Sequence, residues 1–490
     1  MSIPGTINSL PVTCIGGSAF SGCSSLSGVT FPSSITNISG SAFWNCSGLL
    51  SVTIPNSVIS VGDSAFFQCA KMTNVLIGTG LSRLGDSLFY GCTGLTSVTI
   101  PSSVTSLAGA FIGCTGMTNV VIPSGVVSIG NSAFASCSHL TSIIIPSTVT
   151  NIGSQAFSSC SSLNGVAIPN SVVCLGDLAF QQCSSLSNLT IGTGVTKIGN
   201  SAFVSCINLT NVMIPDGITN IGQQAFQACS GLRNVTIGNG IVVLGDYCFY
   251  QCAALTNVSI IGSPTTIGSY AFCNCYGLTN LAIPNSVRTI GNYAFSGCLM
   301  TRVVIPDSVG VVGDSAFLLC TNTTSVTLGN SVTNIGLGAF QLCSGLTSIT
   351  IPKYVATIEA SAFQSCTGLA RVYFKGNAPA FGSGVFTSVT NVTVYYLPGT
   401  TGWDSYFDRP AVLWNPKVLD SNGSLGVKSN RFGFTISGAT NLFIVVYACT
   451  NLGYPIWSNV GTNILAGGSS YFSDPLWTNC QSRFYGFGWQ

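Results

Sequence analysis

A phenylalanine recurs every 23 residues through most of this 490-residue chain. Seventeen such positions run from Phe20 to Phe386, and the spacing shortens to 22 at only two places. Sixteen of them are followed three residues later by a cysteine, whereas Phe386 is followed by Val389. A unit this short cannot bury its own apolar face, so neighbouring units must stack on one another. The spacing therefore predicts a solenoid of about seventeen units.

Each unit has a two-part apolar pattern with the consensus L-T-x-V-x-I-P-x-S-V-x-x-I-G-x-x-A-F-x-x-C. In one well-formed unit, Leu95, Val98 and Ile100 have the spacing of a short strand with one buried face. Pro101 ends this strand because proline cannot donate a ladder hydrogen bond. Val104 and Leu107 predict a second, extended segment with a buried face. We therefore expect parallel strands, one rung per unit.

A polar residue often stands three positions before the phenylalanine. Asp, Asn and Ser are the residues that cap helix N-termini, and Phe and Cys at i and i+3 share one face of a helical turn. The pattern predicts one capped helical turn per unit. The alternatives, a calcium site or a catalytic carboxylate pair, fit less well because Asn and Ser replace Asp in other units. The capping candidates are Asp63, Asp86, Asn131, Ser154, Asp177, Asn200, Asp246, Asn292 and Asp314.

Glycine replaces the strand-ending proline in some units, as in Ile77–Gly80 and Ile191–Gly194. We expect a positive φ at these glycines, which no other residue adopts as readily. They do not form a phosphate-binding loop, because no Walker or dinucleotide fingerprint surrounds them.

The low charge excludes several classes of function. Charged residues make up 5% of the chain and the formal net charge is +2, so no basic surface for nucleic acid is expected. No apolar run approaches the roughly 20 residues that span a bilayer. The N-terminus has neither a basic nor an apolar signal region. It predicts either a cytoplasmic protein or a chain that lacks its true beginning.

The 22 cysteines favour packing over chemistry. Sixteen fall in one column, where free cysteine packs as a small apolar residue. Zinc is disfavoured because His139 is the single histidine and no CxxC pair occurs. We interpret His139 as a surface residue. No catalytic residue, metal or cofactor is therefore expected.

This repeat resembles the BspA-like, or Treponema-pallidum-type, leucine-rich repeats. The resemblance extends roughly from Ile3 to Trp414, and the segments Tyr373–Phe386 and Val394–Phe407 resemble the way such arrays finish. It implies a parallel solenoid on a secreted or surface-attached bacterial protein that binds partners and carries no catalytic residues. Members of this family usually begin with an export signal.

The periodicity stops after Pro416, where short β-type runs alternate with Gly, Asn and Pro. We therefore expect an α/β solenoid over residues 1–416, with a cap at about 373–416, and a small all-β module over residues 417–490. Cys449 and Cys480 are the only cysteines of this module, and a disulfide between them would require an oxidising compartment.

The expected function is non-enzymatic binding or adhesion to a protein or glycan at the bacterial surface. The alternatives are a structural spacer that presents the C-terminal module, and an enzyme confined to that module. The residue between Val and Ile of each strand points outward and is usually Thr or Ser, but Val121, Ile144 and Ala167 break this pattern in succession, and Met213 follows. Exposed apolar strips often mark partner sites, although β-branched residues also suit a strand. The ligand and the oligomeric state are left open.

Overall fold

The computed structural model describes residues 1–403, 411–419, 425–428, 431–440, 442–479 and 482–488. The chain divides into two compact units. Unit 1 comprises Met1–Met300 and Val312–Cys320, and unit 2 comprises Thr301–Val311 and Thr321–Gln490. One boundary between the units falls within strand β25 (Val311–Val312), since Val311 belongs to unit 2 and Val312 to unit 1. Each unit is described by itself.

Unit 1 is a stack of rungs, most of which contribute a longer strand to one face and a two-residue strand to another. Residues 23 positions apart pair in parallel, as Val52 does with Val75. The longer row comprises β4 (Gly28–Val29), β6 (Ser51–Ile54), β8 (Asn74–Ile77), β9 (Ser97–Thr99), β10 (Asn119–Val121), β13 (Gly165–Ile168), β15 (Asn188–Ile191), β17 (Asn211–Ile214), β19 (Asn234–Ile237) and β21 (Asn257–Ile260).

The second row of unit 1 is formed by the other extended segment of each unit, and its two-residue strands usually end in a buried Ile, Val or Leu. It comprises β3 (Cys14–Ile15), β5 (Asn37–Ile38), β7 (Ser60–Val61), β11 (Ser128–Ile129), β12 (Asn151–Ile152), β14 (Cys174–Leu175), β16 (Lys197–Ile198), β18 (Asn220–Ile221), β20 (Val243–Leu244), β22 (Thr266–Ile267) and β23 (Thr289–Ile290). An antiparallel hairpin, β1 (Thr6–Ile7) and β2 (Leu10–Pro11), precedes both rows.

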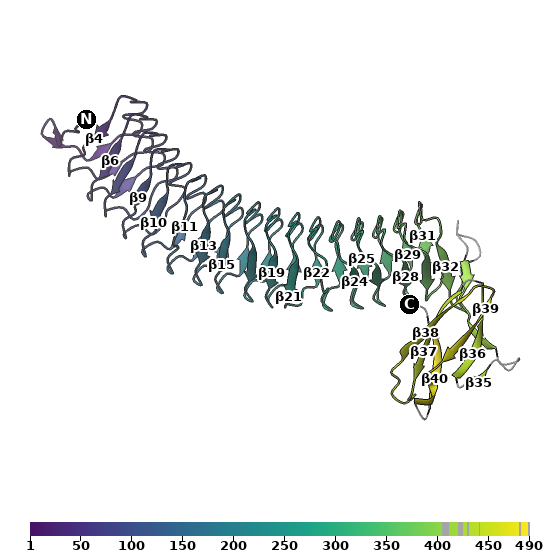
Figure 1. Ribbon diagram of the computed structural model, residues 1–490. Helices are drawn as coiled ribbons and strands as arrows, with labels where there is room; N and C mark the ends of the chain where they lie inside the picture. Colours follow the sequence, from purple (N-terminus) through teal and green to yellow (C-terminus); the bar gives the residue numbers. More distant parts are fainter. Residues whose placement is uncertain (404–410, 420–424, 429–430, 441, 480–481, 489–490) are drawn as a thin grey trace. The chain divides into compact units, whose positions relative to one another are not determined.

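Unit 2 continues the same architecture and ends in two antiparallel sheets (Figure 1). The rung strands are β24 (Arg302–Val304), β26 (Ser325–Thr327), β28 (Ser348–Ile351), β30 (Arg371–Phe374), β32 (Thr393–Tyr396) and β33 (Ala411–Leu413), with β27 (Asn334–Ile335), β29 (Thr357–Ile358) and β31 (Ala380–Phe381) in the second row. The tail contains β34 (Lys417–Leu419), β35 (Gly426–Lys428), β36 (Arg431–Ser437), β37 (Leu442–Cys449), β38 (Ser458–Leu465), β39 (Ser469–Asp474), a 3₁₀ turn η1 (Trp477–Asn479) and β40 (Phe484–Gly488).

The predicted helical turn in each unit is wrong, because η1 is the only helical element among the described residues. Two residues of the turn around Phe66 have a left-handed backbone, Ser64 at φ 56° and Gln68 at φ 54°. The N–H of Phe67 bonds within the turn, to Ser64 O at 3.1 Å, whereas the N–H of Phe66 donates to Leu88 O on the next rung at 3.0 Å. Alternate N–H groups therefore leave the turn, and the i→i−4 ladder of a helix cannot form. The solenoid is built from strands and turns.

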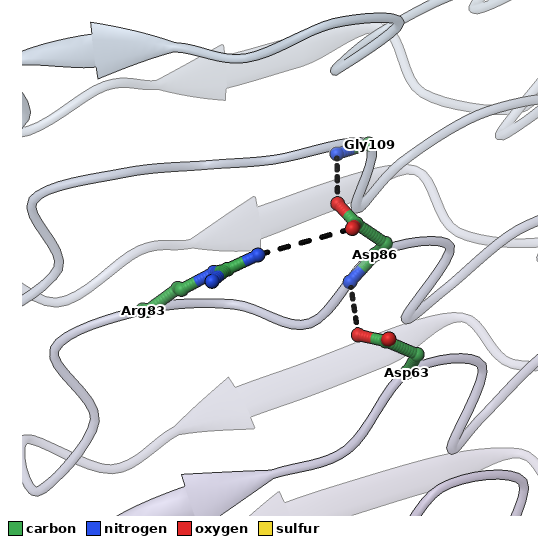
Figure 2. Close-up of polar contacts among 4 residues, drawn as sticks. All are labelled: Asp63, Arg83, Asp86 and Gly109. Atoms are coloured by element: carbon green, nitrogen blue, oxygen red, sulfur yellow. Dashed lines mark hydrogen bonds and ion pairs between the residues drawn. The ribbon is translucent and has the colours of Figure 1, made fainter.

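The expected helix capping by the polar column is also wrong. Asp63 Oδ1 accepts a bond from the N–H of Asp86 at 2.8 Å, and Asp86 Oδ1 accepts one from the N–H of Gly109 at 3.3 Å (Figure 2). Both acceptors thus serve the backbone of the following rung. Asn131 does the same for Ser154 at 2.9 Å. An amide oxygen accepts as well as a carboxylate does, which explains why Asn can replace Asp in this column.

The glycines that replace the strand-ending proline allow the backbones of two neighbouring rungs to lie close together. Gly78 and Gly192 are not among the residues with positive φ, so that prediction is wrong. A Cβ built on Gly78 would lie 2.4 Å from Pro55 O, and one on Gly192 would lie 2.5 Å from the carbonyl carbon of Pro169. Any side chain at these positions would push the rungs apart.

The interior of unit 1 is a continuous ladder of stacked phenylalanines. Ring centroids on successive rungs are 5.0 to 5.7 Å apart, and their planes differ by at most 13°. Offset stacking at this separation is favourable. Phe203 is fully buried between Phe180 at 5.5 Å and Phe226 at 5.2 Å.

From Cys46 onward the cysteine column is buried, as expected. It is also hydrogen-bonded, which the sequence pattern did not reveal. Cys229 Sγ donates to the carbonyl oxygen of Phe203 on the preceding rung at 3.2 Å, and Cys206 Sγ donates to that of Phe180 at the same distance. Burial raises the pKa of the Cys229 thiol to about 12. The column therefore holds neutral thiols, which act as donors as well as packing groups.

Thiol labelling tests this arrangement. Eighteen of the described cysteines are buried, and Cys14, Cys23 and Cys174 are exposed. We expect a thiol reagent to modify these three quickly in the native protein, and the buried column only after unfolding, because the thiolate is the reactive species. The variant Cys174→Ser should lower the native count by one. Rapid native labelling of most of the 22 cysteines would contradict a buried column.

The tail packs against the last rungs of unit 2. Tyr373 and Tyr395 share one apolar cluster with Phe434, Ile444 and Phe472 of the tail sheets. The guanidinium of Arg371 lies 4.8 Å from the ring centroid of Phe443. Division of the chain at residue 416 stays a prediction. Cys449 is buried, but Cys480 lies outside the described residues, so the disulfide between them does too.

Candidate partner-binding surface

The outward strand column, which is the residue between the two buried residues of each longer strand, forms a line along the strand face. Three of its apolar members are adjacent. Val121 is 67% exposed and Ile144 is 82% exposed, and the two are paired in parallel. The bridge between Ser142 and Gly165 sets the register that places Ala167 opposite Ile144. We call Val121, Ile144 and Ala167 the apolar strip.

Met213 lies on the same column but is separated from the apolar strip. Ala167 pairs with Thr190 on the next rung, and Met213 lies on the rung that follows. Met213 is 69% exposed and pairs with Thr236 on its other side. The structure therefore brings three of the four predicted residues together and leaves the fourth beyond one threonine.

Two other large and exposed apolar members of the column, Leu76 and Val304, were missed in the sequence reading. Leu76 is 51% exposed and lies between Thr53 and Thr99 in the sheet. Val304 in unit 2 is 43% exposed and pairs with Thr327. Both occupy the position between Val and Ile of the consensus, so alignment of every unit would have found them. Each is flanked by threonine on at least one side, so neither extends the apolar strip.

Tyr373 and Tyr395 show what an apolar residue on this column can do. Both belong to the outward column, pair with each other through β30 and β32, and are nearly completely buried. The tail sheets cover them. Burial raises the pKa of the Tyr373 hydroxyl above its ordinary value. The outward face of the strands is thus able to pack against folded protein.

The described residues offer little chemistry beyond this surface. His139 is exposed, and its Nδ1 lies 2.6 Å from Thr115 O. No group of three His, Cys, Asp or Glu residues that could hold a metal occurs in the described ranges. Within the same ranges, no helix is long and apolar enough to cross a membrane.

The tail module contains one buried ion pair. Asp474 is 2% exposed, and its Oδ2 lies 2.6 Å from Arg483 Nε. The Tyr485 hydroxyl donates to the same oxygen at 3.0 Å, and burial, with the Asp474 carboxylate as a further cause, raises the pKa of Tyr485 to about 12. The N–H of Leu476 donates to Oδ1 at 2.8 Å, so three partners hold this carboxylate in the interior, which is typical of a structural pair.

Several solved structures are similar to this chain. A leucine-rich repeat protein from Bacteroides ovatus is 24% identical, with 84% of this chain and 91% of that chain covered and a TM-score of 0.48. A leucine-rich cell surface protein from Faecalibacterium prausnitzii is 23% identical, with 81% and 86% covered and a TM-score of 0.36. The T. pallidum leucine-rich repeat protein is 25% identical, with 42% and 76% covered and a TM-score of 0.28. No curated protein matches the chain.

The repeat itself matches a family model described as the BspA type leucine rich repeat region. The matched residues are 5–110, 108–233, 196–321 and 288–406, which together extend over nearly all of the rungs. Repeats of this kind occur in bacterial surface proteins and are generally scaffolds that bind other proteins. On this repeat, matched over far more than half of its length, the chain belongs to the BspA-type leucine-rich repeat family.

Proposed function

We propose that this chain is a non-enzymatic binding protein of the bacterial surface, secreted or attached, and that the apolar strip contacts its partner. The carrying observation is three adjacent outward residues, of which Val121 and Ile144 are 67% and 82% exposed, on a column of hydroxyl side chains. Exposed apolar patches are uncommon on soluble proteins and often mark interaction sites.

The chemistry of the strip favours a protein partner. Branched apolar side chains gain most from contact with other apolar groups, at about 25 cal/mol per Å² removed from water. The burial of Tyr373 on the same column by the tail is an example of such packing within the chain. We include Met213, beyond Thr190, in the proposal as the edge of this surface.

The alternatives differ in what they require. A spacer that only presents the C-terminal module requires no contact at the strip. An enzyme in that module requires reactive groups, whereas Asp474 is buried and paired with Arg483. We therefore favour binding over both.

A screen on matrix proteins and glycans followed by a double variant tests the proposal. Val121→Thr with Ile144→Thr keeps β-branched side chains, so the protein should fold normally. We expect about tenfold weaker binding to a protein identified in the screen, equivalent to about 1.4 kcal/mol. Affinity is measured by biolayer interferometry on the full chain.

A matched control makes the same change elsewhere. Val173, 52% exposed next to β14 in the second row, becomes Thr in Val173→Thr, which should leave the affinity unchanged. Equal affinity of the double variant and the unaltered protein would remove the strip from the interface and favour the spacer.

A further inference from the structure

A groove on the strand face of unit 2 has positively charged side chains in its lining. It encloses about 580 Å³ along β24, β26 and β28. Hydroxyl side chains line the groove together with two cations. The cations come from separate segments, Arg302 from β24 and Lys375 from the chain after β30. The hydroxyl residues are Thr324, Ser325, Thr327, Thr347, Ser348 and Thr350. We call this the Arg302 groove.

Both cations are available to a ligand. Arg302 and Lys375 are exposed, and neither takes part in the ion pairs found among the described residues. No carboxylate lines the groove as described. The acid of a neighbouring turn, Asp307, accepts two bonds from Asn330, at 2.7 and 3.2 Å.

A second hollow adjoins the groove at Lys375. It encloses about 460 Å³, and Lys353, Trp414 and Phe487 line it together with Lys375. A third cation and two aromatic rings thus lie beside the end of the groove. Cations bind and orient acidic groups of a ligand, and aromatic rings provide apolar surface against which its rings can pack.

A similar hollow in unit 1 lacks the cations. It encloses about 470 Å³ over β19 and β21, with Thr236, Asn257 and Ser259 in its lining, and no charged side chain contributes to it. Hydroxyl-lined hollows are therefore a general product of the rungs. Of these two hydroxyl-lined hollows, the Arg302 groove has cations in its lining and the hollow over β19 and β21 has none.

We propose that the Arg302 groove binds a carboxylated glycan. Hydroxyl side chains on rungs about 4.8 Å apart offer hydrogen bonds at a spacing close to the length of a sugar ring. The cations would pair with uronate-type carboxylates, Arg302 in the bidentate manner that suits arginine. This site lies on other rungs than the apolar strip and takes another class of ligand, so it goes beyond the function proposed above.

An acidic peptide fits the groove less well. Extended peptides bind sheets mainly by adding a strand at an open edge. Strands β26 and β28 are interior to the sheet and paired on both sides, so their backbone groups are not free for a new strand. Along these two strands only side chains are available to a ligand, and serine and threonine are the commonest residues of the lining.

The test uses the full chain and three probes in isothermal titration calorimetry. The probes are a short oligogalacturonate, a neutral oligogalactose of the same length, and a polyglutamate peptide. We expect the oligogalacturonate to bind at least tenfold more tightly than either other probe, and its affinity to fall with added salt. Absence of oligogalacturonate binding, or equal binding of the neutral sugar, would overturn the proposal, and tighter binding of polyglutamate would reassign the groove to acidic peptides.

Charge variants locate the binding. Arg302→Gln and Lys375→Gln should each weaken oligogalacturonate binding several-fold, and together at least tenfold. Arg288→Gln removes an exposed cation in unit 1 and should change nothing. The single variants keep the test decisive if the double variant fails to fold. Wild-type affinity in all three groove variants would exclude this groove.

Discussion

Phe203→Ala is expected to lower the free energy of unfolding by about 3–5 kcal/mol, the cost of removing a core phenylalanine. Phe203 is fully buried and stacked on both sides, so its loss leaves a void between Phe180 and Phe226. Each rung contacts only its neighbours, so the damage should concentrate in the adjoining rungs. Denaturant melting measures the loss, and amide hydrogen exchange maps it.

A substitution on the same rung provides the control. Ile207 is 45% exposed, and Ile207→Ala should change stability by no more than about 0.5 kcal/mol. Near-neutral stability of Phe203→Ala would mean that the ladder does not hold the rungs together. Uniform protection loss across unit 1 would instead indicate that the whole array unfolds as one cooperative unit.

Alkaline pH should destabilise the array steeply. Burial raises the pKa of the thiols of Cys114, Cys160, Cys229 and Cys320 to about 12, whereas an unfolded cysteine titrates near 8.5. Between these values the unfolded chain has lost protons that the folded chain retains, so stability is complete below about pH 8.5 and falls as pH rises toward 12. Each thiol contributes about 1.4 kcal/mol per pH unit, or about 5.6 kcal/mol per pH unit for the four.

Variants in which one cysteine is replaced separate this effect from other alkaline transitions. Cys229→Ala should reduce the slope of unfolding free energy against pH by about 1.4 kcal/mol per pH unit, even though it also removes the bond to Phe203 O. Cys174→Ala, at an exposed site, should leave the slope unchanged. Denaturant melts between pH 8 and 11 give these slopes. A stability that does not change over this range would show that the column thiols ionise in the folded protein.

The rung architecture could be predicted because it depends on periodicity alone. A 23-residue spacing of Phe203 and Phe226 fixes which residues lie above one another, since any other register would break every apolar column at once. The same spacing places Val121 beside Ile144 from the sequence alone. Burial of the Phe, Cys and Val/Ile columns followed for the same reason.

The turn could not be predicted because a single unit resembles a capped helix. Asp63 stands three residues before Phe66, as an N-cap residue would. Its Oδ1 instead accepts a hydrogen bond from the N–H of Asp86 on the next rung. The N–H of Phe66 likewise donates to a carbonyl oxygen of the next rung. Local propensity was overridden by hydrogen bonds between units, which no single-unit pattern contains.

The sequence by itself determined the length of the rung, the strand positions and the residues that stack inside, because these follow from repetition. Only the tertiary structure decided which groups meet between rungs. Cys229 Sγ donates to Phe203 O, Asp63 accepts from the backbone of the next rung, and Gly78 lies against the Pro55 carbonyl. It also decided that the tail covers Tyr373 and that Arg302 and Lys375 line one groove. The physical reason is that each of these partners lies at least one rung away in the chain, so its identity depends on how the rungs stack.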